Sequence, residues 1–186
     1  ATFWNKKEVC VSTPTNKETS RIAVEFEHST QEEWNVPCPA CGAFTPLLWA
    51  NIVFDRDKLD EIGCTCPACG VVSSETEWKE QYINGKFVAA HPERKVRGFH
   101  LNALASLFVD WREIVEKFLT ANEEKKKGNI ELLKVWTNTE MGETWEEDGE
   151  QIETDDLYKR REKYNCEVPE EVLVLTAGVD VQDDRF

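Results

Sequence analysis

The chain has 186 residues, 40% of them hydrophobic, and seven tryptophans, which favours a folded interior over a disordered chain. Its formal net charge of −14 argues against a protein built mainly to grip nucleic acid. No apolar run reaches the length of a membrane span, and no signal peptide precedes the first predicted strand. We therefore expect a soluble intracellular protein with no membrane partner. Because the chain opens at Ala1 and stops soon after a strand-like run, we also expect it to be a piece of a longer protein.

A strand and a helix are predicted near the N-terminus. Residues 8–12 have alternating apolar side chains, which is typical of a short strand, and Pro14 ends this pattern because proline cannot donate to a strand ladder. Thr15 and Glu18 have the spacing of a capping box. We therefore expect a helix that begins near Thr15 and continues across 21–26.

The most informative feature is a pentapeptide, Cys-Pro-Ala-Cys-Gly, that occurs at 38–42 and again at 66–70. A tight turn places both cysteines of such a knuckle on one side, and the following glycine tolerates the positive φ needed to leave the turn. Two knuckles supply four thiolates, which is the ligand set of a closed, structural zinc site. The predicted zinc ligands are Cys38, Cys41, Cys66 and Cys69.

Other interpretations of these cysteines stay open. The knuckles could be unrelated turns or a redox pair, although no thioredoxin-like βαβ pattern surrounds them. Cys64 lies two residues before Cys66 and could compete with it as a ligand. The 24 residues between Cys41 and Cys66 slightly exceed the usual zinc-ribbon gap, which a longer loop can absorb. An odd number of cysteines beside a metal motif indicates a reducing cytosol.

Short strands are expected before and after each knuckle, and a helix and two strands follow. Ser74 and Glu77 form a second capping box, which predicts a short helix that ends before residue 85. Residues 86–90 and 96–101 are predicted to be two strands separated by a turn.

Two helices and a linker are predicted next. Asp110 and Glu113 mark the start of an amphipathic helix whose apolar side chains share one face. A further helix is predicted near 130–138. Acidic residues crowd into 142–153, and this composition predicts an exposed linker.

The C-terminal part is predicted to contain a polar helix at 155–164 and then a strand. The apolar run 172–179 is bounded by a proline and by charge, which indicates a strand buried on both faces. Such a strand without partners would be an unprotected edge that could pair with a neighbouring chain.

Four cations lie close together in the sequence, against the acidic background. They are Lys86, Arg94, Lys95 and Arg97. They could contact the phosphates of a DNA duplex, but an ordinary solvated surface is the favoured explanation.

Several short motifs occur in a fixed order over nearly the whole chain. They are VSTPT at 11–15, SRI at 20–22, VPCPACG at 36–42, the second knuckle, GFHLNAL at 98–104, VWTNT at 135–139, GETWE at 142–146 and LTAGVDVQ at 175–182. Taken together, this ordered set resembles the large terminase subunit of tailed bacteriophages, in the lambda-like GpA family.

The resemblance implies an N-terminal packaging ATPase and a C-terminal RNase H-like endonuclease that cuts concatemeric viral DNA. The chain would span their junction. We expect an α+β fold in which a zinc-ribbon module, with short strands and helices around it, is joined to the first strand of an RNase H-like α/β nuclease. The expected parts are the C-terminal end of the ATPase domain (1–32), the zinc-ribbon region (33–80), an α/β connecting region (81–141), an acidic linker and helix (142–168) and the first nuclease strand (169–186).

By this resemblance, Ser12, Thr13 and Thr15 belong to the strand-end motif that couples ATP hydrolysis to DNA movement. Hydroxyl groups there can bond a γ-phosphate or a water molecule, although a capped turn explains the same residues. The sequence contains no GxxxxGK[ST] loop for phosphate. We therefore expect no ATP hydrolysis by this chain alone.

The resemblance also makes Asp180 the first metal-binding carboxylate of a two-metal nuclease site. Such a site needs carboxylates from separate strands around two cations. From the sequence alone, Asp180 could equally be a turn residue at the end of a strand. Asp183 and Asp184 are weaker candidates. Because one carboxylate cannot assemble a two-metal site, we expect no DNA cleavage by this chain alone.

In the intact protein, the resemblance implies ATP and magnesium or manganese beside the structural zinc. The implied partners are double-stranded viral DNA, the terminase small subunit and the portal of the procapsid, in the host cytoplasm. The zinc region would brace two catalytic domains. The main alternative is a non-enzymatic zinc-ribbon adaptor that binds protein or DNA. A stand-alone metal nuclease would need further carboxylates on buried strands within this chain.

Overall fold

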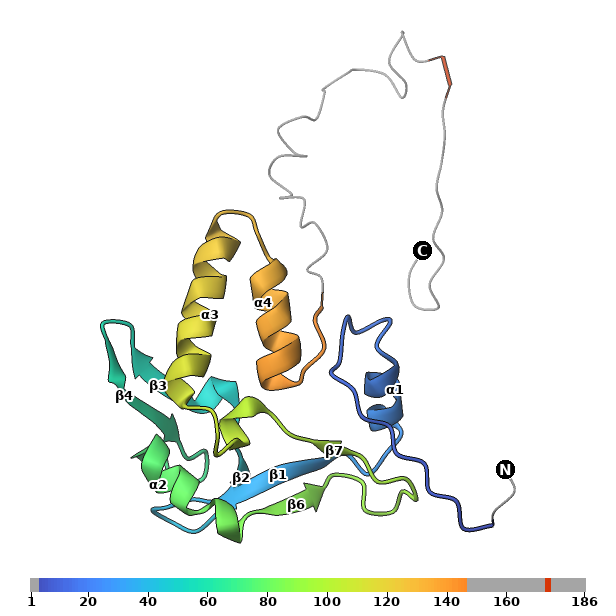
Figure 1. The fold of residues 1–186 in the computed structure, drawn as a ribbon, viewed down its shortest axis with the longest axis horizontal. Helices are drawn as coiled ribbons and strands as arrows, with labels where there is room; N and C mark the ends of the chain where they lie inside the picture. The colour runs from blue at the N-terminus through green and yellow to red at the C-terminus, as the bar shows by residue number, and fades with distance from the viewer. Residues whose placement is uncertain (1–3, 147–172, 175–186) are drawn as a thin grey trace, which may run out of the picture. The chain divides into compact units, whose positions relative to one another are not determined.

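The computed structural model of the chain describes residues 4–146 and 173–174. Two compact units are present, Ala1–Glu147 and Asp148–Phe186. All the described helices and strands belong to the first unit (Figure 1). None of these helices has the length and apolar character needed to span a bilayer.

The first unit is an α+β arrangement of short elements. In chain order they are α1 (Arg21–Glu27), β1 (Glu32–Pro37), β2 (Phe44–Pro46), η1 (Trp49–Asn51), β3 (Ile52–Asp55), β4 (Lys58–Thr65), β5 (Val72–Ser74), α2 (Glu75–Glu80), η2 (Tyr82–Asn84), β6 (Lys86–Ala89), β7 (Phe99–His100), η3 (Ala103–Ala105), α3 (Trp111–Lys126), α4 (Glu131–Trp136) and the π-helix η4 (Thr137–Met141).

The strands form two small sheets. In the first, β1 is central: it pairs antiparallel with β2 and β6 and parallel with β7. In the second, β4 lies between β3 and β5, and both pairings are antiparallel. The long helix α3 and the helix α4 form a hairpin that stands over these sheets in Figure 1. The predicted strands on both sides of each knuckle are therefore confirmed.

The predicted N-terminal strand at 8–12 is wrong. These residues are exposed and form no strand in the part of the chain that the structure describes, because no described strand lies beside them to complete their hydrogen bonds. The predicted helix is present but begins later, at Arg21 after Ser20. The Ser20 side chain accepts the backbone N–H of Thr15 over 3.2 Å, so Thr15 lies in a turn before the helix.

The helix starts predicted at Ser74 and Asp110 are confirmed. Ser74 and Glu77 make a reciprocal capping box at the start of α2, and α3 begins directly after Asp110. The strand predicted at 96–101 is reduced to the two residues of β7. The helix predicted near 130–138 ends as a π-helix, which the left-handed Gly142 (φ 66°) terminates.

The acidic linker predicted at 142–153 falls partly within the described residues, and from 147 onward it lies outside them. Residues 143–146 are described, and Trp145 there forms a parallel bridge with Asn16 instead of lying free in solvent. The helix predicted at 155–164 lies outside the described residues. So does the strand predicted at 172–179, apart from Leu173 and Val174, which are exposed and in neither helix nor strand.

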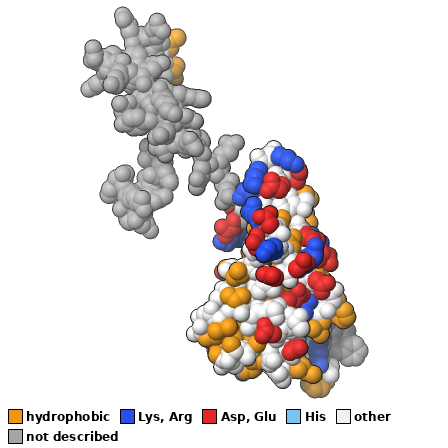
Figure 2. Space-filling view, turned by 90° about the vertical axis from the view of Figure 1, so that its left-hand side faces the viewer, with side chains coloured by type: hydrophobic (Ala, Val, Ile, Leu, Met, Phe, Trp, Pro, Cys, Tyr) orange, Lys and Arg blue, Asp and Glu red, His pale blue; other side chains and the backbone are white. Residues whose placement is uncertain are grey.

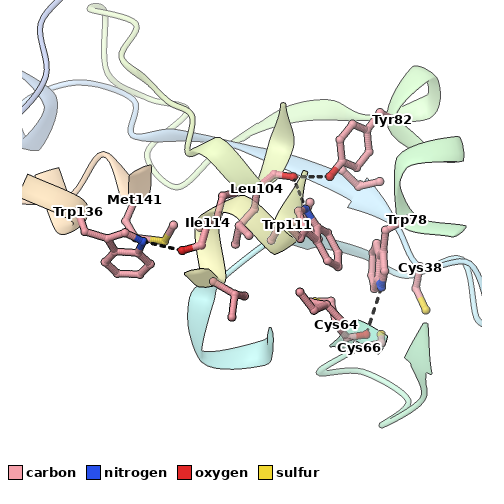
Figure 3. Packing of buried hydrophobic residues seen from close by; sticks show 14 of the residues in the cluster. Cys38, Cys64, Cys66, Trp78, Tyr82, Leu104, Trp111, Ile114, Trp136 and Met141 are labelled. Atoms are coloured by element: carbon pink, nitrogen blue, oxygen red, sulfur yellow. Dashed lines mark hydrogen bonds between the residues drawn. The ribbon is translucent and has the colours of Figure 1, made fainter. Parts of the chain in front are cut away.

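The core is rich in aromatic side chains whose polar atoms bond to backbone carbonyls (Figure 3). The indole N–H of Trp111 and the hydroxyl of Tyr82 both donate to the carbonyl of Leu104. The indole N–H of Trp136 donates to the carbonyl of Ile114 over 3.0 Å. Burying such rings is favourable only when their polar atoms find partners. These bonds join α3 and η2 to η3, and they join α4 to α3.

Candidate metal centre

Each knuckle is the tip of a β-hairpin. The first lies between β1 and β2, and the second lies between β4 and β5. The same hydrogen bond closes the turn of each knuckle. The N–H of Gly42 donates to the carbonyl of Cys38, and the N–H of Gly70 donates to the carbonyl of Cys66, each over 2.8 Å. Gly42 and Gly70 have φ values of 75° and 73°, which a residue with a Cβ rarely adopts. The sequence therefore builds two matching knuckles on two different sheets.

The two hairpins bring the four cysteines together. The Sγ atoms of Cys38 and Cys69 lie 3.9 Å apart, and so do those of Cys41 and Cys66. All four sulfur atoms lie within 4.8 Å of one another. A tetrahedron with Zn–S bonds of about 2.3 Å has edges of roughly 3.8 Å, so this cluster suits a metal such as zinc.

The surroundings of the sulfur atoms shift the pKa values of the individual cysteine thiols in different directions. Burial raises the pKa of Cys66, but hydrogen bonds from the backbone N–H groups of Cys69 and Ala68 and from the Cys38 and Cys69 thiols together lower it to about 7. Burial raises the pKa of Cys38. Although the N–H of Val71 lowers the pKa of Cys69, burial and the neighbouring thiols raise it to about 11. A divalent cation offsets the repulsion between thiolates, so metal binding and proton release are coupled here.

Cys64 is not a member of the cluster. Its side chain is only 2% exposed, and burial raises the pKa of its thiol to about 12. Its backbone carbonyl accepts the indole N–H of Trp78 over 3.1 Å. Cys64 therefore acts as a buried apolar side chain on β4, beneath the second knuckle.

The predicted ATPase motif lies in the N-terminal arm. Ser12 and Thr13 are exposed, and the Ser12 hydroxyl donates to the carbonyl of Thr13 over 3.0 Å. The side chain of Thr15 is also exposed, but its backbone is held by hydrogen bonds to Ser20 and Trp145. Asp180 lies outside the described residues.

Two of the predicted DNA-contacting cations have partners inside the protein. Arg94 donates to the carbonyls of Glu27 and Ser29, at the end of α1. Arg97 makes a two-pronged ion pair with Glu32, with N–O distances of 2.8 and 2.7 Å. Lys86 lies 3.9 Å from the ring centroid of Phe44. Lys95 is exposed.

Figure 2 shows Lys, Arg, Asp and Glu side chains interspersed over the upper part of the visible face. On α3, pairs such as Arg112 with Glu116 and Lys126 with Glu123 form salt bridges. Paired charges of opposite sign cancel at a distance. This face therefore carries no broad patch of positive charge.

Sequence reasoning missed a set of contacts around Asn138. This buried side chain donates to the carbonyl of Thr15 over 3.1 Å and to that of Glu143 over 2.8 Å. Thr15 and Asn138 are 123 residues apart in the chain. No local pattern signals such a contact, because the asparagine sits in a π-helix that the sequence does not announce.

Two profiles of one protein family match successive parts of the chain. The profile described as the ATPase domain of the phage terminase large subunit gpA matches residues 1–87. The profile described as the endonuclease domain of gpA matches residues 96–186. The chain belongs to the gpA family of phage terminase large subunits. The first match includes both knuckles, and the second includes α3 and α4.

Relatives of this gpA-family chain include two phage proteins, each called terminase, large subunit. The one from Enterobacteria phage P21 is 27% identical over 206 residues, which cover 97% of this chain and 31% of that protein. The one from Escherichia phage lambda is 38% identical over 89 residues, which cover 47% of this chain and 13% of that protein. The chain thus spans less than a third of the length of these relatives. No solved structure matches it significantly.

Proposed function

We propose that this chain is the central segment of a terminase large subunit, the enzyme that moves viral DNA by ATP hydrolysis and cuts concatemeric double-stranded DNA. The observation that carries the proposal is the order of the two family profiles, ATPase first and endonuclease second, within 186 residues. The chain would span the junction between the two catalytic domains. Its partners would be double-stranded viral DNA, the terminase small subunit and the portal of the procapsid, in the host cytoplasm.

The four cysteines would hold a structural zinc ion. Four thiolates fill the tetrahedral coordination of zinc and leave no open position for a water molecule, so the ion would not take part in catalysis. Its role would follow from where the knuckles lie. Because they are the tips of hairpins from two different sheets, the ion would fix one sheet against the other. This supports a bracing role for residues 33–80 between the ATPase end at 1–32 and the region that follows.

The two catalytic activities would need residues beyond this chain. Ser12, Thr13 and Thr15 would belong to the motif that couples ATP hydrolysis to DNA movement. Asp180 would be the first carboxylate that binds magnesium or manganese in the nuclease. The sequence contains no phosphate-binding loop, and Asp180 alone could not assemble a two-metal site, so the chain alone would neither hydrolyse ATP nor cut DNA.

The contribution of the four cations to DNA binding would be uneven. Arg94 and Arg97 hold the loop before β7 to α1 and β1, so their replacement would also disturb the fold. Lys86, Lys95 and Arg97 are all exposed, but the Arg97 guanidinium is paired with Glu32. Lys86 and Lys95 would therefore be better placed to contact phosphates.

The proposal is tested in the intact terminase by replacing Asp180 with asparagine. An amide of the same size cannot neutralise the divalent cations, so we expect the Asp180→Asn enzyme to lose DNA cutting while it still hydrolyses ATP. Asp156→Asn, in the predicted polar helix at 155–164, is the matched control and should still cut DNA. Wild-type cutting by Asp180→Asn would overturn the nuclease assignment, and an intact protein without ATP-driven DNA movement would overturn the proposed function.

A further inference from the structure

The segment that follows the exposed N-terminal arm lies beside the last described residues of the first unit. The backbone N–H of Trp145 donates to the carbonyl of Thr15 over 3.0 Å, and the N–H of Lys17 donates to the carbonyl of Trp145 over 2.9 Å. Together these bonds form the parallel bridge between Asn16 and Trp145. We call residues 15–17, Asn138 and 143–146 the clasp.

Asn138 completes the clasp. Its side chain is 9% exposed, and its amide nitrogen donates to two carbonyls, one from each segment: Thr15 at 3.1 Å and Glu143 at 2.8 Å. A side-chain amide has two N–H donors, so both are in use. The carbonyl of Thr15 accepts from both Asn138 and Trp145, so both of its lone pairs are in use too. Losing Asn138 would therefore remove one hydrogen bond to each segment and leave the Thr15 carbonyl with the Trp145 N–H.

Contacts around this centre hold the two segments further. The side chains of Lys17 and Glu146 form an exposed ion pair across the clasp. The N–H of Thr15 donates to Ser20, which is 3% exposed, so the entering segment is also fixed to the start of α1. Trp145 packs against the core cluster of the unit. No residue of either knuckle takes part in these bonds.

We propose that the clasp is the mechanical link between the two domains that flank this module, and that Asn138 is the residue that positions it. This inference rests on the proposed function, under which Ser12, Thr13 and Thr15 belong to the ATPase coupling motif and the chain after Glu146 leads to the nuclease. A shift of the coupling motif would pass directly through the Thr15 carbonyl to Asn138 and Trp145. This transmission of motion does not need the metal centre, whose role is to fix the two sheets against each other.

The clasp itself is tested by amide hydrogen exchange on the zinc-loaded 186-residue chain. In Asn138→Ala, we expect exchange at Lys17 and Trp145 to become faster together, by about tenfold or more, because both amides donate across the clasp. The matched control is Asn102→Ala. Asn102 also donates from its side chain to a distant carbonyl, that of Leu47 at 2.7 Å, but outside the clasp. Unchanged exchange in Asn138→Ala, or an equal rise in the control, would overturn the inference.

A second pair of variants covers the case in which Asn138→Ala does not fold. Lys17→Glu places two negative charges across the clasp at an exposed position, and adding Glu146→Lys restores the pair with reversed signs. Exposed pairs are weak, so we expect exchange at Trp145 to rise about twofold to fivefold in the single variant and to return in the double one. A rise that the second substitution does not reverse contradicts the clasp.

The mechanical role is tested in the intact terminase by the DNA length moved per ATP hydrolysed. We expect this ratio to fall in Asn138→Ala and to stay at the wild-type value in Asn102→Ala. An unchanged ratio in Asn138→Ala overturns the mechanical link. If the unaltered protein moves no DNA at all, the proposed function fails, and the hydrogen-exchange result still decides whether the clasp exists.

Discussion

The indole N–H of Trp78 donates a hydrogen bond to the backbone carbonyl of Cys64 over 3.1 Å. Trp78 is a fully buried residue of α2, and Cys64 lies on β4, two residues before the second knuckle. The helix is thereby attached to the strand that presents two of the four cysteines. The hydrogen bond from Trp78 to Cys64 therefore affects both the packing of α2 in the core and the position of the second knuckle.

Replacing Trp78 with phenylalanine should destabilise the zinc-loaded chain by about 2 kcal/mol, because the smaller ring leaves a void and the bond to Cys64 is lost. The midpoint of urea unfolding measures this change. Trp4→Phe is the control. Because Trp4 is 97% exposed, the free energy of unfolding of this variant should stay within about 0.5 kcal/mol of wild type. Equal midpoints for the two variants would contradict the prediction.

Replacing Cys38 or Cys69 with serine should abolish stoichiometric zinc binding and unfold the knuckles, because three thiolates cannot close the tetrahedral site. Metal analysis together with circular dichroism checks both effects. Cys64→Ala and Cys10→Ser are controls outside the cluster and should keep one zinc ion per chain. One-to-one zinc in Cys38→Ser would mean that the ligands are wrongly assigned and that Cys64 takes part.

Glu32 should make the fold sensitive to acid. The side-chain hydrogen bonds from Arg97 hold the pKa of Glu32 below its ordinary value of 4.5. A carboxyl whose pKa is lowered on folding stabilises the protein above its ordinary pKa, and this contribution is lost as the pH falls through the lowered value. Thermal unfolding from about pH 6 to about pH 2 should therefore show a smaller loss of stability in Glu32→Gln than in wild type. Glu33→Gln, the neighbouring control, should keep the wild-type dependence.

Tyr82 should make the fold sensitive to alkali. Burial raises the pKa of its hydroxyl above the ordinary 10.0. A group whose pKa is raised on folding contributes stability that is fully present below its ordinary pKa, here 10.0, and that is lost as the pH rises through the raised value. Tyr82→Phe should flatten the stability curve above about pH 10, while it costs about 1 kcal/mol at neutral pH because the bond to Leu104 is lost. An unchanged alkaline slope would show that another group governs it.

The features that the sequence predicts well are those fixed by neighbouring residues. The paired Cys-Pro-Ala-Cys-Gly segments form their turns from local bonds and a left-handed glycine, so the cluster of four cysteines follows from their spacing. The capping box of Ser74 and Glu77 and the helix start after Asp110 are local in the same sense.

The features that sequence reasoning misses depend on distant partners. The alternation at 8–12 is a true strand pattern, but a strand needs a neighbour to complete its hydrogen bonds. Arg97 is an exposed cation, and nothing near it in the sequence indicates that it pairs with Glu32, 65 residues earlier. No sequence pattern indicates the role of Asn138, because only the folded chain brings the carbonyls of Thr15 and Glu143 within hydrogen-bonding distance of its side chain.

The meeting of Thr15 and Trp145 also bears on how such proteins diversify. Everything between these residues forms a closed loop whose two ends are one hydrogen bond apart. Regions of this kind can be lengthened, shortened or exchanged without moving the segments that flank them. The zinc-bearing span could therefore be transplanted between relatives as a cassette, provided that the graft keeps the asparagine that ties its ends together.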